Sequence, residues 1–297
     1  MQPKISVITP SFNSEKTIEK TILSVINQQR IYPLEYIVVD GGSTDNTRAI
    51  IQQYAQNIDK FELELELELK LKYKFISEPD SGAYDAMNKG INLATGEIIG
   101  IINSDDWYLE NAIKIVEEEF DKHTDINILY SPIENYYKGE YIATFIPGEL
   151  EKLSIRFTLN HPSCFIKKSA YIAAGLYDLK YKIAADYDMI LRLFNHGFKF
   201  HSIETPLAAY SLNGMSSSPL PWDRAKLIEE CWQISSKASD NFPQVSHKQR
   251  RKAYIAWIIN EVFALPARYF FKPPTARKIK SIIKQVTNKS ASEYGRW

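Results

Sequence analysis

Cysteine is scarce in this sequence, because the 297 residues include only Cys164 and Cys231. Two isolated thiols provide neither the disulfide framework of a small secreted domain nor the paired spacing of a zinc site. The N-terminus also lacks a basic segment followed by a long apolar run, so we expect no signal peptide. These absences favour a location in the cytoplasm.

An excess of charge is absent too, since 36 Lys and Arg residues balance 36 Asp and Glu residues. A neutral chain gives no reason to expect nucleic acid as a partner. No stretch of about 18 residues is free of both charge and proline, which argues against a membrane-spanning helix. The hydrophobic content is an ordinary 44%, enough to bury a sizeable core.

Strand-like and helix-like segments alternate through the first half of the chain. Helical periodicity follows the first apolar run, and we expect Asn13 or Ser14 to cap that helix. The order is typical of βαβ units and predicts an α/β fold with a mainly parallel central sheet flanked by helices. The strand patterns cover residues 5–9, 36–39, 75–77 and 98–102.

Beyond about residue 130 the alternation becomes less regular, and after the serine run 216–218 the sequence turns helical and aromatic. We therefore expect a catalytic domain over residues 1–215 and a C-terminal helical extension over residues 216–297. Residues 62–72 alternate strictly between charged residues and leucine, which predicts a half-buried strand or hairpin. Such a simple repeat favours a structural role over a catalytic one.

Acidic residues follow three successive strand patterns: Asp40 ends the second, Asp80 follows the third, and Asp105 and Asp106 follow the fourth. The carboxyl ends of parallel strands form the ligand-binding edge of an open sheet. Carboxylates gathered there repel one another unless a cation or hydrogen-bond donors offset their charge. Helix capping explains a single Asp of this kind, whereas four converging acids indicate a site.

Three motifs in order resemble the GT-A fold of family 2 glycosyltransferases: ISVITPSFN at residues 5–13, VDGGSTD at 39–45 and NSDD at 103–106. The run EPDSGAYDAMNKG at 78–90 is similar to a bacterial branch that builds cell-surface polysaccharide. The resemblance covers roughly the first two-thirds of the chain. It implies the GT-A nucleotide-diphospho-sugar transferase fold and transfer of a sugar from a nucleotide sugar, with UDP as the expected nucleotide.

The resemblance also implies roles for individual residues. Thr9, Pro10 and Phe12 would line the base, Asp40 would hydrogen-bond to its imide edge, and Asp80 would belong to the same nucleotide-sugar site.

The acidic pair completes this set. Asp105 would contact the ribose, and Asp106 would ligate a divalent metal, Mg²⁺ or Mn²⁺. The chemistry agrees, because such hard cations bind one or two carboxylates together with substrate phosphates. A bound cation also stabilises a diphosphate leaving group.

The resemblance points to Asp186, at the start of a helix, as the catalytic base. A carboxylate opposite the leaving group can take the proton of the attacking hydroxyl, and attack from that face inverts the anomeric carbon. Asp188 is the rival, but on a helix it points about 200° away, so only one of the two faces the sugar. Family members often carry Glu where this chain has Ala185. Capping of the helix is the alternative role for Asp186.

Three further residues are candidates with a structural alternative each. His161 can touch the acceptor or the diphosphate, or serve the fold. Trp107 can stack on a sugar or pack in the core. Lys89 can reach a phosphate or remain a solvated helix residue.

Residues 254–271 are strongly apolar and aromatic, and basic residues follow them. This combination suits a helix in the interface of an anionic membrane, so 254–284 is the candidate for peripheral contact with the inner face of the cell membrane. Packing of the helix on the catalytic domain is the alternative. The expected acceptor is a glycan or a lipid-linked molecule, and the latter would make membrane contact useful.

Two other functions stay open at this point. A sugar nucleotidyltransferase usually needs a basic, Gly-rich loop near the N-terminus, and residues 10–13 (PSFN) do not provide one. A glycan-binding module that has lost activity could retain the same fold. The acids at the strand ends favour an inverting, metal-assisted glycosyltransferase over both.

Overall fold

The computed structural model describes residues 3–58, 70–212, 220–237 and 245–270. Its strands are β1 (Ile5–Ser11), β2 (Leu34–Asp40), β3 (Leu71–Ser77), β4 (Ile98–Ile101), β5 (Trp107–Tyr108), β6 (Ile128–Tyr130), β7 (Ile133–Tyr137), β8 (Glu140–Phe145), β9 (Phe165–Lys167), β10 (Phe200–Ser202) and β11 (Ala208–Ser211). Its helices are α1 (Ile18–Ile26), α2 (Thr47–Gln56), α4 (Ala83–Leu93), α5 (Ala112–Lys122), α6 (Lys168–Ala174), α7 (Ala185–Asn195), α8 (Pro221–Lys237) and α9 (His247–Phe270), with 3₁₀ helices η1 (Leu150–Ser154) and η2 (His161–Ser163).

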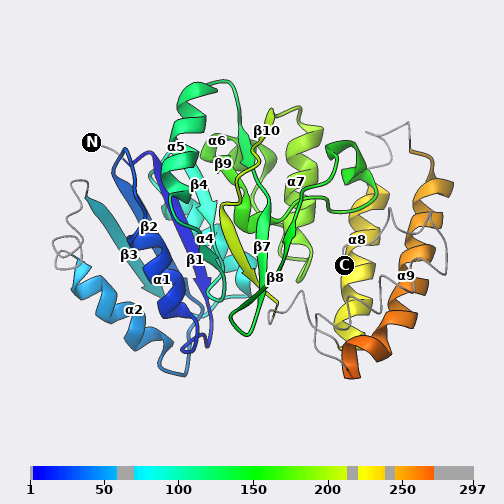
Figure 1. The fold of residues 1–297 in the computed structure, drawn as a ribbon, viewed down its shortest axis with the longest axis horizontal. Coiled ribbons are helices and arrows are strands. Elements are labelled where there is room, and N and C mark those ends of the chain that lie inside the picture. Colours follow the sequence, from blue (N-terminus) through cyan, green and yellow to red (C-terminus); the bar gives the residue numbers. More distant parts are fainter. Residues whose placement is uncertain (1–2, 59–69, 213–219, 238–244, 271–297) are drawn as a thin grey trace.

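A seven-stranded sheet in the order β10-β6-β9-β4-β1-β2-β3 forms the centre of the described residues (Figure 1). Strand β1 pairs in parallel with β2 and β4, β2 with β3, and β6 with β10. Only β9 enters antiparallel, between β4 and β6. A smaller sheet in the order β5-β11-β7-β8 lies beside it. The expected α/β fold with a mainly parallel sheet is confirmed.

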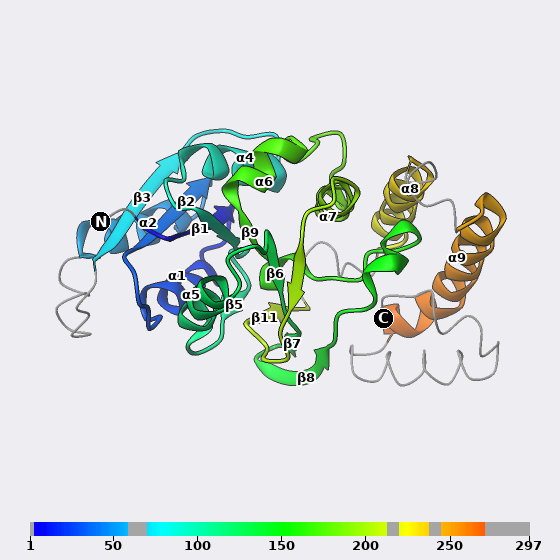
Figure 2. The same cartoon turned by 90° about the horizontal axis from the view of Figure 1, so that it is seen from above.

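Helices cover both faces of the central sheet and create two cores (Figures 1 and 2). On β1, Val7 joins the core under α1, α2 and α5, and Ile8 joins the core under α4, α6 and α7. Strands buried on both faces read as continuous apolar runs, which is why the sequence revealed them. Gly90 allows the close approach of α4, because a Cβ there would lie 2.4 Å from the Ile8 Cγ2 atom.

The first strand runs two residues further than expected, through Pro10 and Ser11. The Ile8 carbonyl accepts a hydrogen bond from the Ile102 N–H at the end of β4. Ile8, and every second residue of β1 after it, therefore turns its backbone N–H and C=O toward β4. Because β4 has ended by that point, a proline at position 10 removes no ladder hydrogen bond.

The expected cap of α1 by Asn13 or Ser14 is wrong. The helix begins at Ile18 without a side-chain cap bond. Asn13 has a left-handed backbone (φ 49°), and its amide oxygen accepts the Thr44 N–H at 2.9 Å. The Asn13 side chain is therefore used to join the loops after β1 and β2.

The charged–leucine repeat lies mostly outside the described residues, and only its end is seen, where Leu71 and Lys72 begin β3. The expected boundary between residues 215 and 216 also lies outside the described residues.

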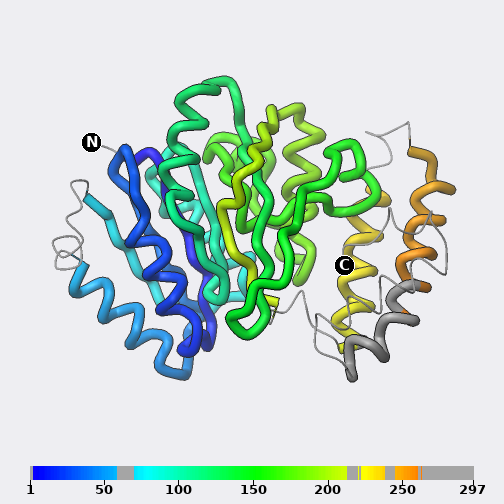
Figure 3. Tube along the Cα trace, in the orientation of Figure 1, coloured from blue at the N-terminus to red at the C-terminus, as the bar shows by residue number. Residues whose placement is uncertain are grey.

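Helices α8 and α9 lie side by side at one end of the molecule, beyond α7 and far from β3 (Figures 2 and 3). Trp232 of α8 meets Tyr254 of α9 edge to face, with 5.0 Å between ring centroids. Ala253 and Tyr254 are buried, so α9 uses this face for packing. Among the helices that the structure describes, none has both the length and the apolar character needed to cross a bilayer.

Candidate active site

A cavity of about 1040 Å³ opens where the carboxyl ends of the parallel strands meet. Its lining comes from the segments after β1, β2, β3 and β4, from residues 156–162, from the start of α7, and from α8 and α9. This is the edge at which open α/β sheets bind ligands. The predicted site residues that line it are Pro10, Phe12, Asp80, Asp105, His161 and Asp186.

Hydrogen bonds between loops fix the floor of the cavity. The Asn13 N–H donates to Ser43 Oγ at 2.8 Å, which links the loops after β1 and β2. The hydroxyls of Ser14 and Ser104 share a bond of 2.7 Å, which links the loops after β1 and β4. The two bonds join the loops after β1, β2 and β4 to one another.

Asp40 and Thr9 do not line the cavity. Asp40 is fully buried at the end of β2, where its carboxylate accepts the Ser43 N–H at 3.1 Å and the Ser77 hydroxyl at 2.7 Å. Thr9 is also buried and shares a 3.0 Å bond with the Tyr36 hydroxyl. Both residues support the cavity from behind, and direct contact with a base stays a prediction.

Asp80 borders the cavity and shapes the loop after β3. Its Oδ1 atom accepts the Gly82 N–H at 2.8 Å. Gly41 passes so close that a Cβ at that position would lie 2.4 Å from Asp80 Oδ2. Glycine at position 41 therefore lets the loops after β2 and β3 meet.

Asp105 lines the cavity, whereas Asp106 lies buried behind it. The Asp106 carboxylate accepts the Ser211 N–H at 2.8 Å and the Asn103 side-chain amide at 3.0 Å. Burial raises the pKa of both carboxyls, and for Asp106 the charge of Asp105 adds to the effect. A cation next to two such carboxyls would relieve this penalty, and their all-oxygen donor set fits Mg²⁺ or Mn²⁺.

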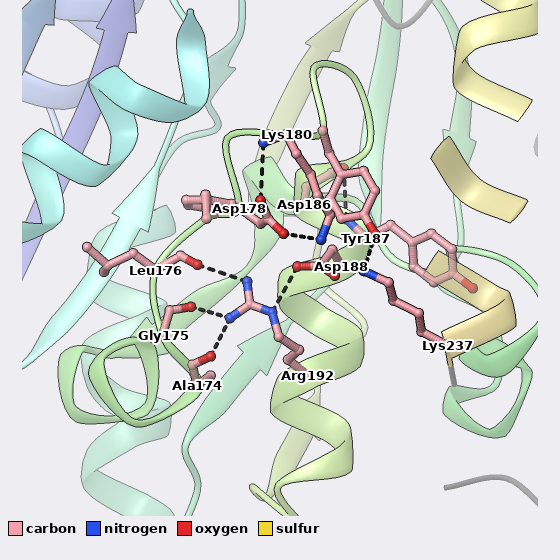
Figure 4. Close-up of polar contacts among 12 residues, drawn as sticks. Ala174, Gly175, Leu176, Asp178, Lys180, Asp186, Tyr187, Asp188, Arg192 and Lys237 are labelled. Atoms are coloured by element: carbon pink, nitrogen blue, oxygen red, sulfur yellow. Dashed lines mark hydrogen bonds and ion pairs between the residues drawn. The ribbon is translucent and has the colours of Figure 1, made fainter. Parts of the chain in front are cut away.

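The two acids of α7 point to different surroundings (Figure 4). Asp186 lines the cavity, and its Oδ1 atom accepts the Tyr187 N–H at 2.8 Å. Asp188 pairs instead with Arg192 Nε at 2.8 Å, and that guanidinium also binds the carbonyls at the end of α6 and just after it. The geometry makes Asp186, and not Asp188, the acid that faces the cavity.

Tyr84 of α4 supports the segment before α7. Its hydroxyl donates to the Ile183 carbonyl at 2.8 Å and lies 3.4 Å from Asp186 Oδ1. Burial and the nearby charge of Asp186 raise the pKa of Tyr84 well above its ordinary value. The phenol therefore stays neutral and acts as a donor.

Trp107 and Lys89 lie away from the lining. The Trp107 ring packs against Tyr136, with 4.9 Å between centroids, and Lys20 Nζ lies over it. Lys89 pairs with Glu78 at 2.8 Å. Neither residue lines the cavity, so their contacts with a sugar or a phosphate stay predictions.

Sequence patterns missed the basic residues of the cavity. Lys16, Arg156 and Lys182 line it beside the acids. Lys182 lies four residues before Asp186, so its closeness to a predicted site residue could have identified it from the sequence. Arg156 lies in a region without readable periodicity. Also unexpected were the lining residues from the C-terminal helices: Leu227, Cys231 and Trp257.

A second group of potential metal ligands lies elsewhere. Glu119 and His123 at the end of α5 meet His201 of β10, with 3.2 Å from Glu119 Oε2 to His201 Nε2 and 3.7 Å to His123 Nε2. None of the three lines the cavity. This cluster is thus separate from the Asp105–Asp106 pair.

The sequence model described as "Glycosyl transferase family 2" matches residues 6–170, more than half of the chain. The chain therefore belongs to glycosyl transferase family 2 and is a glycosyltransferase, as the motifs predicted.

Known proteins agree with this assignment. The PGL/p-HBAD biosynthesis glycosyltransferase of Mycobacterium bovis is 27% identical over 199 residues, which span 65% of this chain and 71% of that protein. The structure of the mannosyltransferase PcManGT from Pyrobaculum calidifontis with GDP-Man and Mn²⁺ matches at TM-score 0.64 and 16% identity, covering 99% of this chain and 83% of that one.

S. aureus TarS in complex with UDP-GlcNAc matches at TM-score 0.59 and 18% identity, covering 88% of this chain and 73% of that one. In a longer TarS structure the match spans 50% of that chain. At these identities the solved structures show the shared GT-A fold, which confirms the expected architecture.

Proposed function

We propose that this protein transfers a sugar, with inversion and metal assistance, from a UDP-linked donor to a glycan or lipid-linked acceptor. The observation that carries the proposal is that Asp105 and Asp186, which are 81 positions apart in the sequence, line one cavity. Donor-holding acids and an acceptor-facing acid are the two parts that such a transfer needs.

The donor end of the cavity has suitable chemistry for a nucleotide. The side chain of Phe12 is 59% exposed, although an aromatic ring favours burial, and this suits stacking on a base. Lys16, Arg156 and Lys182 supply positive charge for the diphosphate. The nucleotide-sugar complexes of TarS and PcManGT, with UDP-GlcNAc and GDP-Man, support a donor of this class.

Asp106 would ligate the divalent ion, and Asp105 beside it would contact the ribose. When bound, Mg²⁺ or Mn²⁺ neutralises the diphosphate and stabilises it as a leaving group. The Mn²⁺ in the PcManGT complex supports this expectation. The ion would also lower the pKa values that burial raises in these two carboxyls.

Asp186 would act as the general base. Its carboxylate takes the proton from the acceptor hydroxyl while the hydroxyl oxygen forms a bond to the anomeric carbon. The bond from that carbon to the diphosphate breaks on the opposite face, so the anomeric configuration inverts. The Tyr187 N–H, which donates to Asp186 Oδ1 at 2.8 Å, orients the carboxylate, and the Tyr84 hydroxyl holds the backbone just before α7 through the Ile183 carbonyl.

The test uses the purified full chain, a panel of UDP- and GDP-sugars and Mn²⁺, with nucleoside diphosphate release and product anomer as readouts. We expect Asp186→Asn to lower kcat by on the order of 10²–10⁴-fold while the donor KM changes little. Asp188→Asn is the matched control, because it changes the neighbouring acid that pairs with Arg192. Full activity in folded Asp186→Asn would show that Asp186 is not the base. Unchanged turnover in Asp106→Ala would show that Asp106 does not bind a catalytic metal.

The alternatives predict different products. A sugar nucleotidyltransferase would consume a nucleoside triphosphate with a sugar phosphate, and an inactive module would bind a nucleotide sugar without transfer. The placement of Asp186 at the same cavity as Asp105 favours transfer, because an inactive module has no need to retain both acids there.

Membrane contact at residues 254–284 belongs to the same proposal. Ile255, Ile258, Ile259 and Val262 form an exposed apolar stripe on α9, opposite the face that packs on α8. The basic residues that follow in the sequence complement an anionic bilayer, which is the partner we propose for this stripe. The protein would then lie at the inner face of the cell membrane.

We also propose that the chain divides into a catalytic domain (1–215) and a C-terminal helical extension (216–297).

A further inference from the structure

Besides lining the cavity, the extension binds the segment just before α7 through the carboxylate of Glu230 on α8. Glu230 is 5% exposed and accepts three successive backbone N–H groups: Lys182 at 2.8 Å, Ile183 at 2.8 Å and Ala184 at 2.9 Å. These three residues directly precede α7, on which Asp186 is the second residue.

Glu230 binds the segment that leads into α7, not the first turn of the helix. Ala184 stands at the N-cap of α7, and its N–H is the last of the three that Glu230 accepts. In the first turn, the Tyr187 N–H is bound instead by Asp186 Oδ1 at 2.8 Å. A carboxylate near a helix N-terminus also interacts favourably with the helix dipole.

The segment is held from two sides. Glu230 binds its N–H groups, and Tyr84 donates to the Ile183 carbonyl from the other side. The three bonds to the Glu230 carboxylate are charge-assisted, which is the stronger kind, and the bond from Tyr84 is neutral. Four hydrogen bonds on so short a segment leave it little freedom. Near Glu230 on the same helix, Leu227 and Cys231 line the cavity.

We propose that Glu230 is a positioning residue for Asp186, so that the C-terminal extension is a working part of the active site. The inference rests on the proposed role of Asp186 as base. Glu230 itself does not line the cavity. It acts by fixing the backbone from which the base projects, and small displacements of a base lower its rate steeply.

The first test compares Glu230→Gln with Glu229→Gln in the full chain. The Glu230→Gln substitution keeps the shape of the side chain but removes its negative charge. It also places a side-chain NH₂ group opposite backbone N–H groups, which cannot donate to it. Glu229 is the exposed neighbour, and it accepts the Gln233 side-chain amide at 3.3 Å. We expect kcat to fall at least about tenfold in Glu230→Gln, with the donor KM unchanged, and no change in Glu229→Gln.

Equal rates in the two variants overturn the inference, and so does a donor KM that rises while kcat stays constant. If Glu230→Gln does not fold, Glu230→Asp keeps the charge and retracts it by one methylene. A folded Glu230→Asp protein with wild-type kcat also overturns the inference.

A second readout does not depend on activity. Backbone hydrogen exchange at residues 182–188 should be faster in Glu230→Gln than in the wild type and unchanged in Glu229→Gln. A wild-type protein without transfer activity would refute the proposed function while this measurement still tests the contact. Unchanged exchange in Glu230→Gln would refute the contact even if the wild type is active.

Discussion

Burial divides the acids near the cavity into two groups. Asp40 and Asp106 are buried, whereas Asp80, Asp105 and Asp186 border the cavity. The strand-end pattern predicted that Asp40, Asp80, Asp105 and Asp106 would gather at this edge. It could not predict their directions, because a decisive partner such as the Ser211 N–H lies 105 positions from Asp106.

Phe12 provides a prediction for a single residue. Phe12→Ala removes an exposed ring at the donor end of the cavity, so we expect the donor KM to rise about tenfold, equivalent to roughly 1.4 kcal/mol. The free energy of unfolding should change little, because the ring buries little surface in the free protein. Steady-state kinetics and urea denaturation measure the two quantities.

The control for Phe12 is Tyr141→Ala, which removes another exposed aromatic ring, on β8 and outside the cavity lining. A donor KM that rises equally in both variants would contradict the stacking role.

Among the elements, the long apolar strands were predictable, whereas β6 and β7 were not. Strands β1, β2 and β4 are buried on both faces, so their composition alone identified them. Strands β6 and β7 are separated only by Ser131 and Pro132 and are too short for a clear period. Helix α9 has two different faces: one packs on α8, and the other carries an exposed apolar stripe, for which membrane contact stays a proposal.

The stripe on α9 leads to a prediction at this scale. The double change Ile258→Ser and Ile259→Ser should weaken binding to vesicles of anionic lipid by at least about tenfold. It removes two apolar side chains that would be buried in the lipid when the protein is bound. Vesicle co-sedimentation measures the affinity.

Ile172→Ser is the control for the stripe, since Ile172 on α6 is 55% exposed, more than Ile258 (45%) and Ile259 (46%). Binding that is unaffected by the double change, or equally affected by the control, would contradict membrane contact through α9.

For the whole molecule, the fold class followed from the βα alternation, but the role of the extension did not. The contact of Glu230 with residues 182–184 joins segments 46 to 48 positions apart. A single glutamate on a helix gives no sign in the sequence of such a partner. The buried Glu35 likewise joins several strands, because its carboxylate accepts the Ser6 hydroxyl at 2.6 Å and pairs with Lys74 at 2.8 Å.

Glu35 makes the stability of the whole protein depend on pH. Burial raises its pKa, but hydrogen bonds from Lys74, Ser6 and Thr95 outweigh burial and hold the pKa at about 2, below the ordinary 4.5. A lowered acid pKa stabilises the fold above pH 4.5, and the contribution is lost as the pH falls toward 2. The full contribution is about 3 kcal/mol, of which about 2 kcal/mol is lost by pH 3.

Urea denaturation at pH 6 and pH 3 tests this dependence. Between pH 6 and pH 3, the free energy of unfolding should fall by about 2 kcal/mol less in Glu35→Gln than in the wild type. Glu97→Gln is the control, because that side chain is 63% exposed. An equal loss in the wild type and Glu35→Gln would contradict the assignment.

The Glu230 contact also has a consequence for hybrid enzymes assembled from family members. A crossover between residues 215 and 216 would take Glu230 from one parent and its three N–H donors from the other. The carboxylate would then face a foreign segment whose length and path it does not match. Productive shuffling of tails therefore requires that residues 182–184 and α8 be exchanged as a matched pair.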